Sequence, residues 1–141
     1  MLKLFIDSDI VLDMFLMREP HAGAALRLMS LLEKGIYSGY TSPLVFANVH
    51  YIMRRSLGPA LSKKNLQHLH TILDVLSMDA RVVDRALASS FKDFEDGLQY
   101  FSALHHKINR IITRNGRDFS NSTIVVSTPE EFLRVHDSGE L

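Results

Sequence analysis

The apolar run at residues 2–6, which ends directly at Asp7, is the feature that most constrains the fold of this chain. A short run without polar alternation is typical of a strand buried on both faces of a parallel sheet. Similar runs occur at residues 36–41, 110–113 and 124–126, and helical stretches separate them. Because parallel strands need crossover connections, this order predicts an α/β fold, a three-layer α/β/α sandwich with a short parallel central sheet.

Helices are predicted between these strands by the spacing of apolar residues and by capping residues. The clearest start is Ser42-Pro43, a capping hydroxyl before a proline at the first helical position, and Gly58-Pro59 would end the same helix. Tyr51 of this helix is assigned to the core. The predicted helices cover residues 10–17 (capped by Ser8 or Asp9), 21–34, 43–57, 62–76, 80–89, 93–107 and a last one from residue 129.

The composition limits the number of domains and the class of protein. A chain of 141 residues fits a single domain, residues 1–141. The 16 basic and 16 acidic residues cancel, so the strongly basic field of a protein that binds nucleic acid mainly by charge is absent. Without cysteine there is no disulfide or thiolate metal site, and we expect a cytoplasmic protein. Acids interrupt the first apolar stretch, so no membrane span is predicted.

Acidic residues gather at one predicted edge of the sheet. Asp7 follows the first strand, and Asp118 lies in the loop after the third. Asp93 and Asp96 begin a crossover helix, which starts at the same edge because it runs antiparallel to the strands. Since sites in open parallel sheets form beyond the carboxyl ends of the strands, we expect these acids to converge.

Converging carboxylates favour a bound cation, because without one they raise each other's pKa values. Oxygen ligands alone select Mg²⁺ or Mn²⁺, ions that also bind substrate phosphates. Such an ion would lower the pKa of a bound water to make a nucleophile, so phosphodiester cleavage is the matching chemistry. Arg114 and Arg117 flank the predicted site and are candidates to contact a phosphate.

Each acid also has an ordinary structural interpretation. Asp93 and Asp96 suit the N-terminus of a helix. Asp7 would be costly to bury without a partner, and a salt bridge would also explain it. Asp118 suits a turn. Asp13 lies four residues after Asp9 and is not predicted to be a metal ligand. It would support the ligands, face solvent or cap the next turn.

Four segments resemble, in order, the motifs of the PIN-domain family. They are FIDSDIVLD, which is similar to the opening motif hhhDTNVLLD, then SPLVFANVHYIMRR, DFEDGLQYFSA and ITRNGRDF, the last of which is similar to TRNxxDF. The resemblance covers nearly the whole chain and is weakest between residues 58 and 90. It implies a VapC-like or PilT N-terminus-like ribonuclease.

The resemblance also implies roles for individual residues. Asp7, Asp96 and Asp118 would hold Mg²⁺ or Mn²⁺, and Ser8 and Asn115 would orient them. Further implied consequences are an RNA substrate, a small antitoxin protein lying over the acids, and a homodimer formed through the helices between residues 43 and 77.

Two positions depart from the family pattern. Asp9 stands where the first motif usually has Asn, and Asn48 stands where the second motif usually has an acid, six residues after Ser42. Asn48 offers a neutral oxygen, so the site would carry one fewer negative charge. Our hypothesis is that Asp9 or Asp93 compensates. The residues expected to support the site are therefore Asp9, Asn48, Asp93 and Thr113, with Ser8 and Asn115.

Two other functions remain open from the sequence. A PIN-like domain that has lost efficient cleavage through Asn48 would bind RNA or a partner protein. A haloacid-dehalogenase-type phosphatase is the minor alternative, because DSDIV satisfies DxDx[TV] with Asp7 as nucleophile and Asp9 as acid and base. The phosphatase would need a lysine beside the phosphoaspartate, and TRNGRDF occupies the expected loop instead.

Overall fold

The computed structural model describes residues 1–141 and contains a five-stranded parallel sheet in the order β3-β2-β1-β4-β5. The strands are β1 (Lys3–Ile6), β2 (Ser38–Thr41), β3 (Asp74–Val75), β4 (Arg110–Ile112) and β5 (Val125–Ser127). In the centre of the sheet, Phe5 of β1 is in register with Tyr40 on one side and Ile111 on the other. The predicted parallel sheet is confirmed.

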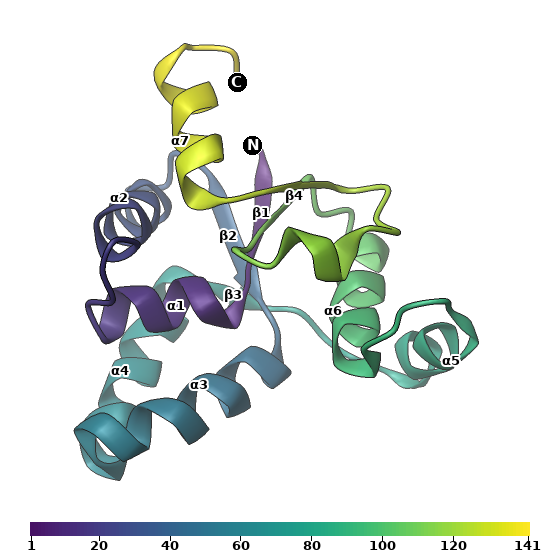
Figure 1. The fold of residues 1–141 in the computed structure, drawn as a ribbon, viewed down its shortest axis with the longest axis horizontal. Coiled ribbons are helices and arrows are strands. Elements are labelled where there is room, and N and C mark those ends of the chain that lie inside the picture. Colours follow the sequence, from purple (N-terminus) through teal and green to yellow (C-terminus); the bar gives the residue numbers. More distant parts are fainter.

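Helices cover both faces of the sheet, which confirms the three-layer sandwich. Figure 1 shows α1 and α2 on one side of β1, and α6 with α5 on the other. The helices are α1 (Ser8–Phe15), α2 (Ala22–Glu33), α3 (Pro43–Leu57), α4 (Pro59–Ile72), α5 (Ala80–Ala88), α6 (Phe94–His105) and α7 (Pro129–Asp137), with a 3-10 turn η1 at Gly116–Phe119. None of them is both long and apolar enough to cross a membrane.

The prediction was wrong between residues 58 and 77. The helix expected at 62–76 begins at Pro59 and ends at Ile72, and the edge strand β3 follows it. Leu73 and Leu76 fit the helical spacing and are buried, but they flank an extended segment. The backbone N–H of Leu76 donates to the carbonyl of Thr41, 2.8 Å away, so pairing with β2 replaces the last helical turn. The turn η1 was not predicted either.

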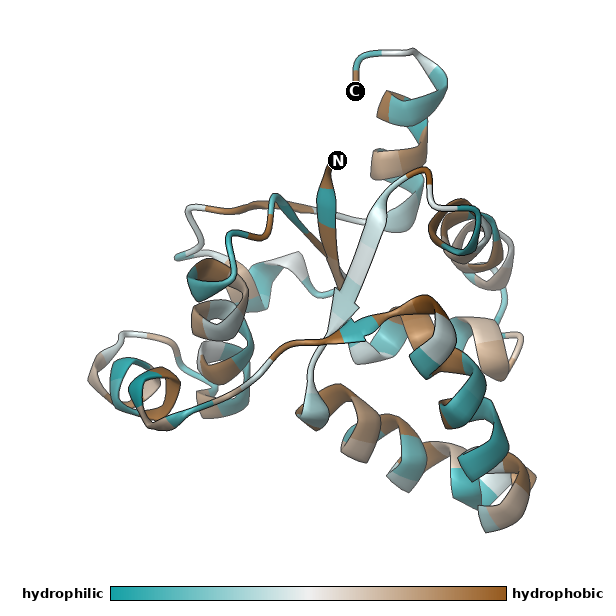
Figure 2. Ribbon diagram, turned by 180° about the vertical axis from the view of Figure 1, so that it is seen from behind, coloured by the Kyte–Doolittle hydropathy of each residue, from teal (hydrophilic) through white to brown (hydrophobic).

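The core lies against the central strand. Leu4, Phe5 and Ile6 are fully buried, and Figure 2 shows β1 coloured mainly as hydrophobic while β2 is pale. Burying side chains of this size stabilises the fold by about 2 kcal/mol each. Close packing also explains Gly39 in β2, because a Cβ there would lie 2.5 Å from Cδ2 of Leu73.

Candidate active site

Asp7 lies at the junction of β1 and α1 and is nearly buried. Its backbone N–H still pairs with the carbonyl of Ile112, and its carboxylate accepts the N–H of Ser8 at 2.7 Å as the N-cap of α1. The other carboxylate oxygen accepts the hydroxyl of Thr113 at 2.9 Å. Burial, followed by the charge of Asp9, raises the pKa of Asp7 to about 6. Asp7 thus holds its negative charge only weakly in the absence of a cation.

Asp9 joins the first turn of α1 to the loop after β4. Its Oδ2 accepts the backbone N–H of Arg114 at 2.9 Å and the side-chain amide of Asn115 at 3.3 Å. Burial raises the pKa of Asp9, and the contacts with Arg114 oppose that shift. The other oxygen, Oδ1, and the hydroxyl of Ser8 are buried without a hydrogen-bond partner. Both atoms are therefore free to bind a water or a ligand.

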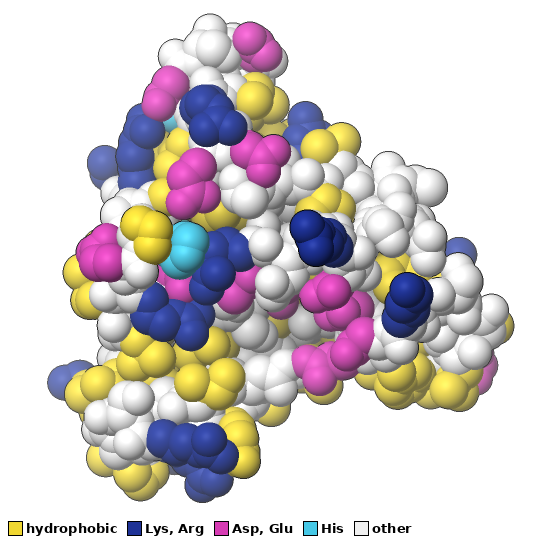
Figure 3. Space-filling model, viewed as in Figure 1, with side chains coloured by type: hydrophobic (Ala, Val, Ile, Leu, Met, Phe, Trp, Pro, Cys, Tyr) yellow, Lys and Arg dark blue, Asp and Glu magenta, His cyan; other side chains and the backbone are white.

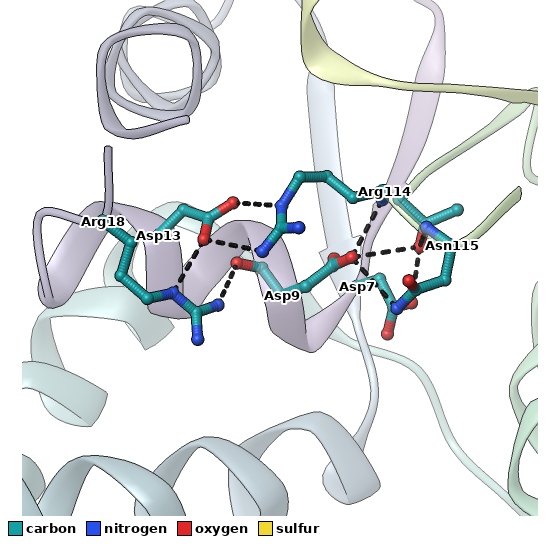
Figure 4. Close-up of polar contacts among 7 residues, drawn as sticks. Asp7, Asp9, Asp13, Arg18, Arg114 and Asn115 are labelled. Carbon is teal, nitrogen blue, oxygen red and sulfur yellow. Dashed lines mark hydrogen bonds and ion pairs between the residues drawn. The ribbon is translucent and has the colours of Figure 1, made fainter. Parts of the chain in front are cut away.

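Asp13 holds two arginines on the same side of the site (Figure 4). Its carboxylate is fully buried and accepts Nε of Arg18 at 2.8 Å. Arg114 donates to it from Nε at 2.7 Å and from Nη2 at 3.0 Å. Of the three interpretations that the sequence left open for Asp13, the solvent-facing one is wrong. The guanidinium of Arg114 already donates to Asp13, so the expected contact of Arg114 with a phosphate stays a prediction.

Asp96 and Asp93 occupy the first turn of α6. Asp93 caps the helix, since its Oδ1 accepts the N–H of Asp96 at 3.1 Å. Asp96 is half-buried and its pKa is raised to about 7, first by desolvation and then by the charges of Asp93, Asp118 and Asp7. The exposed Asp118 lies in η1. Its charge and that of Asp7 are among those that raise the pKa of Asp96, and all three acids line one space.

That space is an open cleft of about 470 Å³ at the carboxyl ends of β1 and β4. A second cleft of about 210 Å³ adjoins it, and Asp96 and Asp118 line both. Arg117 lines the second cleft, and Figure 3 shows acidic side chains between α3 and η1 with basic side chains beside them. The predicted residues that line the first cleft are Asp7, Ser8, Asp9, Asn48, Asp96, Arg114, Asn115 and Asp118.

Two polar contacts join α3 to α6 beside this cleft. The hydroxyl of Ser42, which caps α3, donates to the side-chain oxygen of Gln99 at 2.6 Å, and both residues are buried. The amide of Asn48 donates to the carboxylate of Glu95. The helices that carry Asn48 and Asp96 are thereby held together.

The residues of the cleft fit a hard divalent cation. Its donors are oxygen atoms, and Asp9 leaves a buried carboxylate oxygen without a partner. As placed, no three acidic or histidine side chains converge on a single point closely enough to hold an ion by themselves. Mg²⁺ keeps several of its waters, so carboxylates that are spaced apart can hold it partly through those waters.

Some residues of the site were not predicted. Glu95 lines the first cleft, and so does Tyr51, which the sequence interpretation assigned to the core but whose side chain is half exposed. Tyr51 and Ile52 follow Asn48 by three and four residues, so they share its helix face, and this spacing was the available signal. Asp93, by contrast, lines only the second cleft.

The sequence matches the family model for the PIN domain over residues 3–117. Ribonuclease VapC1 from Aquifex aeolicus (strain VF5) is 24% identical over 135 residues, which cover 92% of this chain and 92% of that protein.

Solved structures with the same fold include VapC20 of Mycobacterium tuberculosis, a toxin that cleaves the sarcin-ricin loop. It has a TM-score of 0.69 and 19% identity, covering 86% of this chain and 96% of that one. VapBC2 from Rickettsia felis, bound to a DNA fragment from its promoter, has a TM-score of 0.68 and 14% identity, covering 90% and 98%. The family match spans β1 to β4 and includes Asp7 and Asp96, and the chain therefore belongs to the PIN-domain family.

Proposed function

We propose that this protein is a VapC-type endoribonuclease that depends on Mg²⁺ or Mn²⁺, with Asp7, Asp96 and Asp118 as the metal-binding acids. The observation that carries the proposal is that these three acids line the same open cleft. PIN-domain membership and the similarity to Ribonuclease VapC1 support the same activity. Family membership also sets the phosphatase alternative aside.

The residues around the acids have distinct roles in this proposal. Thr113 and the N–H of Ser8 orient the carboxylate of Asp7, and Asn115 with the backbone of Arg114 orients Asp9. A bound divalent ion would supply a water of lowered pKa and neutralise charge on the phosphate.

The substrate we propose is a single-stranded segment of RNA. Arg117 and Lys92 line the second cleft, where they would contact a neighbouring phosphate. Tyr51 also lines the first cleft with its side chain half exposed, and the guanidinium groups of Arg54 and Arg55 lie 5.3 and 4.5 Å from the centre of its ring, so this group offers stacking and positive charge to an unpaired nucleotide. Both contacts lie beside the acids, so a strand would cross them.

A small antitoxin is the proposed protein partner, because similar chains were solved as toxin–antitoxin complexes, including one from Klebsiella pneumoniae with a TM-score of 0.69. Homodimerisation is proposed through α3 and α4, where Ile52 and Leu61 are 40% and 45% exposed. Light scattering of the purified protein would measure the oligomeric state.

The test is cleavage of a panel of structured RNAs by the purified protein in Mg²⁺, Mn²⁺ or EDTA. We expect metal-dependent cleavage by the wild-type protein and none by the Asp7→Asn/Asp96→Asn variant. Cleavage that persists in EDTA or in this variant would contradict the proposal. RNA binding without cleavage would instead identify a PIN-like binding domain weakened by Asn48.

A further inference from the structure

The contact between Asn48 and Glu95 combines a neutral and an acidic side chain on facing helices. Asn48 lies on α3, and Glu95 precedes Asp96 in the first turn of α6. The side-chain amide of Asn48 donates to Oε1 of Glu95, and both residues are half-buried and line the first cleft. The pair therefore brings one negative charge into the cleft.

The charge of Glu95 is directed at the acids of the site. Glu95 lines the same cleft as Asp7 and Asp96, and its charge is among those that raise the pKa of both. Glu95 has no salt bridge with any lysine, arginine or histidine. A half-buried carboxylate beside two others, with only a neutral amide as partner, is an unfavourable arrangement unless a cation is bound.

We propose that Glu95 supplies the fourth negative charge of the metal site, and that Asn48 orients it. The inference rests on the proposed function, because it concerns the same divalent ion. It accounts for the neutral residue at position 48: an acid there would face Glu95 at hydrogen-bonding distance and repel it. With Asn48, the amide holds the carboxylate in place instead.

The framework around the pair is already rigid. Ser42 and Gln99 form a buried hydrogen bond between the same two helices. Gln99 lies four residues after Glu95, so the two contacts lie on one face of α6. Glu95 is therefore held toward the cleft before any ion binds, which lowers the entropy lost on binding.

The two acids first expected to compensate for Asn48 are engaged at least in part, and Asp9 keeps one free oxygen. Asp93 caps α6 and lines only the second cleft. One oxygen of Asp9 accepts hydrogen bonds from the loop after β4. Asn48 contacts neither of them through a side-chain hydrogen bond, whereas it contacts Glu95 directly.

The test exploits the similar shapes of amide and carboxylate. Glu95→Gln removes the charge and still allows a hydrogen bond between the two amides. Asn48→Asp/Glu95→Gln moves the charge to position 48 and keeps the hydrogen bond with its direction reversed. Mn²⁺ binding to the metal-free proteins would be measured by calorimetry and by the electron paramagnetic resonance signal of free Mn²⁺. Glu33→Gln is the matched control, because Glu33 is exposed at the end of α2.

We expect Glu95→Gln to weaken Mn²⁺ binding by about 10- to 100-fold, the range seen when a group supporting a metal site is removed. The exchange variant should recover most of that loss, and Glu33→Gln should bind as the wild type does. Thermal unfolding in EDTA should show all four proteins folded, which separates a charge effect from a structural one.

Three results would overturn the inference. If Glu95→Gln binds Mn²⁺ as tightly as the wild type, Glu95 is not part of the site, although the proposed function stands. If Glu95→Gln loses binding and the exchange variant recovers none of it, the charge shared by this pair is not what matters. Absence of Mn²⁺ binding by the wild-type protein would overturn this inference together with the metal dependence of the proposed function.

Discussion

Asp7→Asn is expected to stabilise the metal-free protein at neutral pH, although Asp7 is central to the proposed site. The buried carboxyl of Asp7 has a pKa of about 6 against an ordinary value of 3.8, mainly because burial disfavours its charged form. Ionising it therefore opposes folding. At about 1.4 kcal/mol per pKa unit, the loss reaches about 3 kcal/mol once the pH exceeds about 7.

The net gain is smaller than this loss, because the variant also alters a hydrogen bond. Asn at position 7 can still cap α1 through its side-chain oxygen, but the contact with Thr113 needs a new donor and acceptor arrangement. Allowing about 1 kcal/mol for that change leaves a gain of about 2 kcal/mol. At about 3 °C per kcal/mol, the melting temperature at pH 7.5 should rise by roughly 6 °C.

The pH dependence distinguishes this cause from others. When folding raises the pKa of a carboxyl, the fold loses stability as the pH rises from the pKa of the unfolded state to the pKa of the folded state. At pH 4.5 the carboxyl of Asp7 is mostly protonated in the folded wild-type protein, and its burial costs only about 1 kcal/mol of stability. Asp7→Asn removes this cost, but its altered hydrogen bond costs about the same amount. The advantage of Asp7→Asn should therefore disappear at that pH.

The assay is thermal and urea unfolding followed by circular dichroism in EDTA at both pH values. Asp84→Asn, a change of the same kind at an exposed position of α5, should have little effect at either. Lower stability of Asp7→Asn at pH 7.5, or a gain that persists at pH 4.5, would refute the reasoning. Millimolar Mn²⁺ at pH 7.5 should stabilise the wild type and leave Asp7→Asn unchanged.

Three further outcomes follow from the structure. Mn²⁺ affinity measured by calorimetry should rise at least roughly tenfold between pH 5.5 and 7.5, because Asp7 and Asp96, with pKa values of about 6 and about 7, must lose protons to bind it; a flat profile would contradict this. Asp13→Ala should destabilise the fold in urea unfolding by about 3 kcal/mol, since its two arginine partners would lose a buried counter-charge; a loss below about 1 kcal/mol would count against that pairing. Gly39→Ala should lower the free energy of unfolding by about 1 to 3 kcal/mol, because its Cβ would lie 2.5 Å from Leu73; an unchanged melting temperature would show that Leu73 can move.

The features that sequence could predict depend on local pattern and on the rules of parallel sheets. A short apolar run ending in Asp7 indicates a buried strand, and Ser42-Pro43 indicates a helix start, without knowledge of the rest of the chain. The rule that sites form at the carboxyl ends of strands then brought Asp7, Asp96 and Asp118 to one edge. Their location in one cleft agrees with this argument, whereas their role as ligands stays a prediction.

What sequence could not predict depends on partners that are distant in the chain. Asp13 meets Arg114 across 101 positions, and Asn48 meets Glu95 across 47. No periodicity identifies such pairs, because each residue alone suits a solvated helix face or, for Arg114, a solvated loop. The edge strand β3 was missed for a related reason. Leu73 and Leu76 fit helical spacing, and the segment is extended because it pairs with β2, where the N–H of Leu76 donates to the carbonyl of Thr41.

The buried ion pairs of Asp13 leave Asp7 and Asp96 without a cationic partner. Arg18 and Arg114 both line the cleft, yet both donate to Asp13. The charges that act most strongly on Asp7 and Asp96 are carboxylates, and the pKa values of both are raised accordingly. Were Arg114 free to pair with Asp7, it would lower that pKa and compete with a metal ion. By holding both arginines, Asp13 would keep the negative charge of the cleft available for the proposed divalent ion, although it is not itself placed as a ligand.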